Sequence, residues 1–253
     1  MRLLIVRHAE PDYTHDSLTE KGRREAELLA QRLSKIPAEA YYVSPLGRAR
    51  ETAEYTLRLV GKQAETLPWL AEFRGYTVRD GKKRIPWDYP TREWYPHKRL
   101  LDRDEWLTDE MMQGGTVSQI WEETKEGVDA LLKKHGYART GGVYRCEHNR
   151  DATIVIFCHF GIGMAILAYL FNTSPLPLWQ SFLCVTSSVT TVVTQEREKG
   201  EVEFRCVALG DASHLMQGNE NASWAGLFPE CYNGVDTTSP SSWPSQPQLP
   251  LIR

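Results

Sequence analysis

Three short runs of apolar residues, each followed by a segment with helical periodicity, constrain the fold of this chain most. They cover residues 3–6 (LLIV), 40–43 (AYYV) and 153–158 (TIVIFC). Short, continuous apolar runs are typical of strands buried on both faces, and such strands belong to sheets that helices cover on both sides. The sequence therefore predicts an α/β protein, a three-layer α/β/α sandwich with a mostly parallel central sheet.

Further predicted elements complete this order. Capping boxes at Ser17-Leu18-Thr19-Glu20 and Thr116-Val117-Ser118-Gln119 predict the starts of two helices, which end near residues 33 and 134. The other predicted elements are helices over 48–59 and 161–171, a weaker strand over 65–70, and strands over 185–194 and 201–209.

Two segments fall outside this regular order. Residues 73–115 combine aromatic residues with prolines and many charges, without helical or strand periodicity. We expect an irregular insertion there, with short helices, that caps the core. The core then spans residues 1–215, and residues 216–253 form an irregular tail that packs on it through Trp224, Phe228 and Trp243.

Charge and cysteine content limit the class of protein. The formal net charge of −3 gives no global reason to expect nucleic acid or an anionic membrane as a partner. The five cysteines are widely spaced and form no Cys-x-x-Cys pair, which favours a reducing compartment. The N-terminal apolar run is too short for a signal peptide, and no run is long enough to cross a bilayer. We expect a cytoplasmic protein, and the sequence leaves open whether it forms a homodimer.

The predicted strands end in side chains that can bind or transfer a phosphoryl group. In chain order these strand-end residues are Arg7, His8, Arg48, Glu72 and His159. In open α/β sheets, ligands bind at the carboxyl ends of the strands. Arginine forks and histidine N–H donors match the oxygens of a phosphoryl group. The strand ends therefore predict an anion site that contains a nucleophile and an acid.

Four segments in this order, LLIVRHAEP, LTEKGRREAELL, SPLGRARETAE and FCHFGIGMAIL, resemble the histidine phosphatase (phosphoglycerate-mutase-like) superfamily. The later GDASHL, residues 210–215, is similar to the motif that closes the family's core. The resemblance spans about residues 1–72 and 116–215, and its R-H-[GA]-E and S-P-L-x-R-A-x-x-T-A motifs are specific in combination. It implies a phosphoglycerate-mutase-like fold.

The resemblance also implies a role for each strand-end residue. His8 would attack phosphorus and become a phosphohistidine, while Arg7, Arg48 and His159 would hold the equatorial oxygens. Glu72 would act with the two histidines in catalysis, because it would protonate the leaving alkoxide and then deprotonate the attacking water. Members of the family need no metal, and we expect no cofactor.

Elementary chemistry agrees with these roles. An imidazole nucleophile must keep one nitrogen unprotonated, with the other fixed by a hydrogen bond, often to a backbone carbonyl. Neighbouring cations lower its pKa and stabilise the charge of the transferring group. An alkoxide is a poor leaving group and requires an acid. Glu10, adjacent to His8, is the alternative acid, although a structural role suits it better.

The chain departs from the mutase branch of the family. That branch resembles R-H-G-x-S-x-W-N and G-E-R-x-Y-G, whereas this chain reads RHAEPDYTHD and AEFRGYTVRD. The difference favours a phosphatase that acts on a small phosphorylated metabolite. A phosphotransfer mutase and a non-catalytic binder of phosphorylated ligands are the alternatives, and the presence of both His8 and His159 disfavours the binder.

The insertion carries a local charge of +4, from seven basic and three acidic residues between 79 and 99. One interpretation is a basic, aromatic lid that grips a second phosphate or a ring of the substrate. The other is a solvated loop packed by its aromatic residues, which suits most of the charges better. Arg84, Arg92 and Lys98 are the candidates to face the pocket.

Other phosphatase chemistries do not fit the sequence. A cysteine-based phosphatase needs Cys-x5-Arg, and no cysteine has an arginine six residues later. An aspartate-based one needs Asp-x-Asp-x-[Thr/Val] after an apolar strand, and the segment at Asp102 lacks both the strand and the fifth residue. Cys146 and His148 are too few for a metal site, so we expect none.

Overall fold

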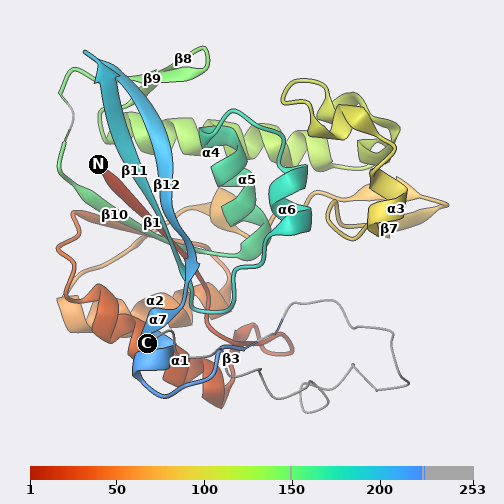
Figure 1. Ribbon diagram of the computed structural model, residues 1–253. Coiled ribbons are helices and arrows are strands. Elements are labelled where there is room, and N and C mark those ends of the chain that lie inside the picture. The colour runs from red at the N-terminus through yellow and green to blue at the C-terminus, as the bar shows by residue number, and fades with distance from the viewer. Residues whose placement is uncertain (149, 224, 226–253) are drawn as a thin grey trace, which may run out of the picture.

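In the computed structural model, which describes residues 1–148, 150–223 and 225, an eight-stranded sheet forms the centre of the molecule (Figure 1). Its strands are, in order, β5 (Glu65–Thr66), β4 (Ala40–Val43), β10 (Thr153–Cys158), β1 (Arg2–Arg7), β11 (Val189–Glu198), β12 (Glu201–Asp211), β9 (Val143–Arg145) and β8 (Ala138–Thr140). The half from β5 to β1 is parallel, and the half from β11 to β8 is antiparallel. The sheet is therefore parallel where the predicted site lies and mixed overall.

Helices cover both faces of the sheet (Figure 1). The helices of the core are α1 (Glu20–Leu33), α2 (Gly47–Val60), α4 (Val117–Lys134), α5 (Phe160–Leu170), α6 (Leu176–Ser181) and α7 (Ser213–Gln217). Alternate side chains of β1 point to opposite layers: Leu4 and Val6 pack in the cluster of α1 and α2, and Leu3 and Ile5 in that of α4 and α5. This alternation confirms the predicted three-layer sandwich.

The register of the parallel strands aligns their carboxyl ends. Arg7 pairs with Cys158 across β1 and β10, and Phe157 pairs with Val43 across β10 and β4. Beyond these pairs, the backbone N–H of His8 donates to the Cys158 carbonyl at 3.0 Å, and that of Ser44 donates to the Phe157 carbonyl at 2.9 Å. The residues that follow three separate strands therefore lie side by side.

The insertion at residues 73–115 packs as part of the core. It contains a hairpin of β6 (Thr77–Arg79) and β7 (Lys82–Arg84), helix α3 (Thr91–Trp94), and the 3-10 helices η2 (Lys98–Leu101), η3 (Trp106–Thr108) and η4 (Glu110–Met112). Short helices were expected, whereas the hairpin was not. Leu100, Trp106 and Met111 are fully buried in the same cluster as α4 and α5. The insertion thus adds a wall to the core.

Two capping predictions need correction. Helix α1 begins at Glu20 after the N-cap Thr19, because Ser17 and Leu18 form the short strand β3 (Ser17–Leu18), which pairs with β2 (Pro11–Asp12). The Thr19 hydroxyl accepts from the Gly22 N–H at 3.0 Å. Thr116 is the N-cap of α4 as predicted, but its hydroxyl accepts from the Tyr76 N–H at 3.4 Å and makes no capping bond.

Three strand predictions also differ from the structure. The strand expected over residues 65–70 ends at Thr66, because Pro68 begins the 3-10 helix η1 (Pro68–Leu70). The strand expected from residue 185 begins only at Val189. The β8–β9 hairpin occupies a segment for which the sequence indicated no element.

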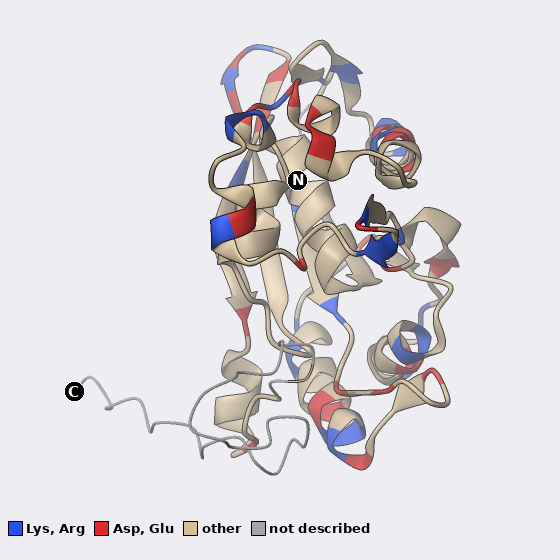
Figure 2. Cartoon of the chain, turned by 90° about the vertical axis from the view of Figure 1, so that its right-hand side faces the viewer, with Lys and Arg blue, Asp and Glu red and all other residues tan. Residues whose placement is uncertain are grey.

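Charged residues are mixed in sign over the surface. Figure 2 shows basic and acidic segments interspersed over the helices and loops that face the viewer. In the tail, Glu220 pairs with Lys21 and Arg24; Trp224, Phe228 and Trp243 lie outside the described residues. No helix in the described part of the chain is both long and apolar enough to cross a membrane.

Two helical glycines give opposite expectations for the same substitution. A Cβ at Gly22 would overlap the Glu10 carbonyl oxygen, whereas a Cβ at Gly163 would meet its neighbours at 3.7 Å or more. We expect Gly22→Ala to lower the free energy of unfolding by about 1–3 kcal/mol through overpacking. Gly163→Ala is the matched control and should raise it by up to about 1 kcal/mol through helix propensity. Urea denaturation followed by circular dichroism measures both, and equal effects would contradict the packing of α1 on the loop at Glu10.

Candidate active site

His8 is held in the tautomer that a nucleophile requires. Its side chain is buried, and its Nδ1 lies 2.8 Å from the carbonyl oxygen of Ala9. A carbonyl oxygen only accepts, so Nδ1 carries the proton and Nε2 keeps its lone pair. Burial, followed by the positive charge of Arg7, holds the pKa of His8 well below its usual 6.5. The imidazole is therefore neutral and nucleophilic near neutral pH.

His159 faces His8 from the end of β10, with the ring centroids 5.0 Å apart. Its Nε2 lies 2.7 Å from the hydroxyl of Ser44, which itself accepts from the Leu46 N–H at 3.2 Å. Burial, followed by Arg48 and then Arg7, lowers the pKa of His159 to about 2. Since Ser44 can donate to Nε2, Nδ1 becomes the proton-bearing nitrogen, and it has no partner among the described residues.

Two arginines supply positive charge beside these rings. Arg7 is buried and donates to the carbonyls of Cys184 and Ala225. The Nε atoms of both Arg7 and Arg48 are buried without a hydrogen-bond partner among the described residues. An unsatisfied buried donor is unfavourable unless a ligand fills it, so these nitrogens and His159 Nδ1 form a ready set of anion donors.

Asp16 holds Arg48 in place. Its carboxylate accepts from the Arg48 guanidinium at 2.5 Å and from the Gly47 N–H at 2.7 Å. The second bond places a carboxylate at the N-terminus of α2, where the helix dipole favours negative charge. A Cβ at Gly47 would overlap the Asp16 carbonyl oxygen, so only glycine allows this approach. Asp16 was not predicted as a site residue, because no motif marks the loop between β2 and β3 that contacts the start of α2.

Glu72 lies at the N-terminus of α5. Its Oε1 accepts from the backbone N–H groups of Phe73 at 2.7 Å and Ile162 at 3.0 Å. These bonds favour the carboxylate, but burial outweighs them and raises the pKa of Glu72. A carboxyl group in this position can hold a proton and release it. Glu10, the alternative acid, instead accepts from the Thr19 hydroxyl at 2.8 Å at the start of α1.

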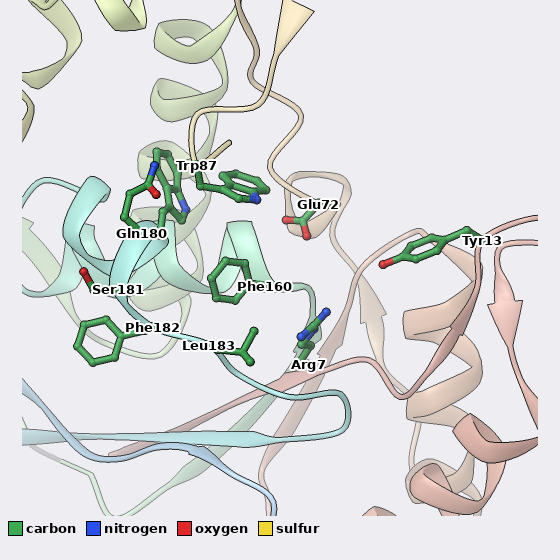
Figure 3. A pocket seen from close by; sticks show the side chains of 10 residues that line it. Arg7, Tyr13, Glu72, Trp87, Phe160, Gln180, Ser181, Phe182 and Leu183 are labelled. Atoms are coloured by element: carbon green, nitrogen blue, oxygen red, sulfur yellow. The ribbon is translucent and has the colours of Figure 1, made fainter. Parts of the chain in front are cut away.

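Arg7 and Glu72 open into a cavity of about 380 Å³ (Figure 3). Its other lining residues are Tyr13, Trp87, Phe160, Trp179, Gln180, Ser181, Phe182 and Leu183. Figure 3 shows Arg7 and Glu72 between Tyr13 on one side and the aromatic residues of the insertion, α5 and the segment after α6 on the other. The cavity is therefore mostly aromatic beside the charged strand ends.

The cap candidates do not line this cavity. Arg84 pairs with Glu93 at 2.9 Å, donates to the Asp88 carbonyl and stacks on Tyr89, all within the insertion. Arg92 and Lys98 are exposed and stand outside the lining. Trp87 is the residue that the insertion contributes. The sequence indicated an aromatic insertion but not which ring would face the strand ends, because that depends on its irregular backbone.

No metal cluster lies in the part of the chain that the structure describes: no three His, Cys, Asp or Glu side chains are grouped to hold an ion there. Positive charge at the site comes from the two arginines. The sequence-predicted strand-end residues are thus brought together, with Ser44 and Asp16 as added supports.

The chain is similar to known phosphatases over most of its length. The family model described as the histidine phosphatase superfamily (branch 1) matches residues 3–207. Phosphoserine phosphatase 1 from Hydrogenobacter thermophilus is 25% identical over 218 residues, which cover 78% of this chain and 88% of the relative.

Solved structures show the same fold at lower identity. A phosphoserine phosphatase variant from Entamoeba histolytica in complex with phosphoserine gives a TM-score of 0.55 at 21% identity, with 85% of this chain and 98% of the other covered. A mycobacterial glucosyl-3-phosphoglycerate phosphatase in complex with VO3 gives 0.55 at 19% identity, with coverage of 82% and 98%.

The Asp16–Arg48 contact gives a prediction for anion binding. Asp16→Ala has two opposing effects on anion binding: it removes a negative charge, which favours the anion, and it releases the Arg48 guanidinium from its fixed position. Because Asp16 is partly exposed and its charge is screened, we expect the loss of Arg48 positioning to dominate. Affinity for inorganic phosphate, measured by calorimetry, should fall about tenfold. Asp12→Ala is the control, because it removes a carboxylate that contacts His15 and the Thr14 N–H on the same loop. Unchanged or tighter binding in Asp16→Ala would contradict the positioning role.

Proposed function

The chain belongs to the histidine phosphatase superfamily and is a phosphomonoester hydrolase, and we propose that it acts on a small phosphomonoester through a phosphohistidine on His8. One observation carries the mechanism. The Nδ1–H of His8 donates to the Ala9 carbonyl, so Nε2 keeps its lone pair for attack on phosphorus. Around it lie three buried nitrogens without partners among the described residues, on Arg7, Arg48 and His159.

In the first step, the lone pair of His8 Nε2 attacks phosphorus, and the bond from phosphorus to the ester oxygen breaks. Arg7, Arg48 and His159 donate to the equatorial oxygens and stabilise the charge of the transferring group. Glu72 begins protonated, as its raised pKa favours, and gives its proton to the departing alkoxide. The products are the free alcohol, phosphohistidine and the Glu72 carboxylate.

In the second step, water enters where the alcohol has left. The Glu72 carboxylate takes a proton from this water, the water oxygen attacks phosphorus, and the bond to His8 Nε2 breaks. Inorganic phosphate leaves, and Glu72 is protonated again. We propose that the arginines supply all the positive charge that the reaction needs, so that a chelator of divalent cations leaves the rate unchanged.

Removal of the nucleophile tests the covalent step. We expect His8→Ala to lower kcat by at least about a thousandfold with any phosphomonoester. Wild-type enzyme quenched in base during turnover should carry one acid-labile phosphate on His8 by mass spectrometry. His15→Ala, an exposed histidine of the neighbouring loop, should keep both activity and label. Full turnover in His8→Ala, together with no phosphate label on the wild-type protein, would contradict the proposed mechanism.

The acid gives a pH dependence. Glu72 must be protonated in the first step, so kcat/KM for an alkyl phosphate should fall as pH rises through the raised pKa of Glu72. Because the pKa of His8 is depressed, activity should persist below pH 6.5. Glu72→Gln should remove the alkaline fall and lower kcat about 10²–10⁴-fold for ethyl phosphate.

A second substrate separates Glu72 from ionisation of the substrate itself. 4-Nitrophenyl phosphate has a leaving group that needs no proton, so Glu72→Gln should slow its first step far less. A pH limb present for both substrates reports the phosphate group, and only the difference between them reports Glu72. Because Glu72 also acts in the second step, the comparison uses kcat/KM, which reports the first step. An equal loss of kcat/KM for the two esters would contradict a role as general acid.

A further inference from the structure

We propose that the aromatic cavity beside Glu72 receives an uncharged alcohol that carries an aromatic ring, and that it disfavours leaving groups with a second anionic group. The inference rests on the proposed function, since it names the substrate class of the same site.

The walls of the cavity are built to contact a flat ring. Trp87 lies with its ring centroid 6.2 Å from that of Phe160 and 5.4 Å from that of Trp179. Trp179 is itself fixed, because its Nε1 donates to the Gly161 carbonyl at 2.9 Å. Tilted and edge-to-face pairs of this kind extend naturally to one further ring. A cavity of about 380 Å³ is large enough for a ring-bearing alcohol.

Two exposed aromatic residues flank the same cavity. Tyr13 is 62% exposed and Phe182 is 45% exposed. Single exposed aromatics are common on protein surfaces. Here, however, both line the cavity that Trp87 and Phe160 line, and Figure 3 places them on opposite sides of Arg7. Phe182 lies on the side of Trp87 and Phe160, so a ring bound there would remove apolar surface of Phe182 from water.

The charge of the cavity argues against a second anion. Among the described residues that line it, only Arg7 and Glu72 are charged, and the phosphoryl transfer uses both. The basic residues Arg84 and Lys98 of the insertion do not line this cavity, and Arg84 forms an ion pair with Glu93. A carboxylate on the leaving group would lie near Glu72 without a cation to pair with it, which is unfavourable in a partly desolvated site.

Neutral polar groups complete the lining. Gln180 and Ser181 lie at the cavity, and Gln180 Nε2 is buried without a partner among the described residues. Neither side chain carries a charge that could pair with an ionic group of the leaving alcohol. The side-chain chemistry therefore differs from what phosphoserine would require, since the serine part of that ester carries both a carboxylate and an ammonium group.

Steady-state kinetics with four alkyl esters test the substrate class. Benzyl phosphate, ethyl phosphate, phosphoserine and 3-phosphoglycerate all release alkoxides, so differences in kcat/KM report mainly the cavity. We expect benzyl phosphate to exceed ethyl phosphate by at least about tenfold, and both charged esters by more. Equal values for benzyl and ethyl phosphate, or a preference for phosphoserine or 3-phosphoglycerate, would overturn the inference.

Variants locate the preference. Phe182→Ala and Trp87→Ala should each lower the ratio of benzyl to ethyl phosphate kcat/KM about tenfold. Phe182→Lys should raise 3-phosphoglycerate relative to benzyl phosphate, and Phe182 is exposed enough that both substitutions should fold. Tyr95→Ala is the matched control, an insertion aromatic that is 75% exposed and outside the cavity. A ratio that changes as much in Tyr95→Ala as in Phe182→Ala would overturn the assignment to this cavity.

Binding separates this inference from the proposed function. In the His8→Ala protein, calorimetry should show tighter binding of benzyl phosphate than of phosphoserine, whether or not the wild type turns either over. If the wild type is labelled on His8 but prefers phosphoserine, the inference fails and the proposed function stands. If benzyl phosphate binds preferentially but no ester is hydrolysed, the proposed function fails and the binding preference stands.

Discussion

Two backbone hydrogen bonds extend the pairing of three parallel strands just beyond their ends. The His8 N–H donates to the Cys158 carbonyl, and the Ser44 N–H donates to the Phe157 carbonyl. They fix which residue of each strand reaches the edge of the sheet. A shift of one residue in β1 would exchange its inward and outward side chains, and would bury Arg7 and His8 in the wrong layers. Such a shift is prevented because Leu3 and Ile5 fit one hydrophobic cluster and Leu4 and Val6 the other. The two cores therefore determine the geometry of the site.

Burial gives these strand ends their chemistry. Desolvation is the largest effect on the pKa of both histidines and of Glu72, and it favours the neutral form of each. The arginines cannot respond in the same way, because a guanidinium stays protonated. The site thus carries positive charge from two arginines, which Asp16 balances only in part. In the proposed mechanism, a phosphoryl group would restore that balance and accept from donors that have no partner within the described residues.

The sequence predicted the strand ends well and their supports poorly, for a physical reason. Arg7, His8, Arg48 and His159 follow apolar runs that only a buried parallel sheet can accommodate, so local pattern and global fold agree. Glu72 follows a 3-10 helix and not a strand, and its position depends on the bonds it accepts at the start of α5. Asp16 and Trp87 come from irregular backbone, where periodicity carries no information. The basic residues of the insertion did not indicate which side chains line the cavity either, since Arg84 forms an ion pair with Glu93 within the insertion.

One glycine joins the acid to the aromatic wall. A Cβ at Gly161 would collide with the Trp87 ring and would lie 2.7 Å from Glu72 Oε1. The carbonyl of the same residue accepts from Trp179, and its backbone leads into the N–H of Ile162 that Glu72 accepts. Glu72 and the Trp87 ring are thus packed against one turn of α5. A ligand that displaced Trp87 would therefore also disturb Glu72, the general acid of the proposed mechanism. In the proposed mechanism, this coupling would let an insertion remote in sequence from His8 act both on which alcohol binds and on how fast it leaves.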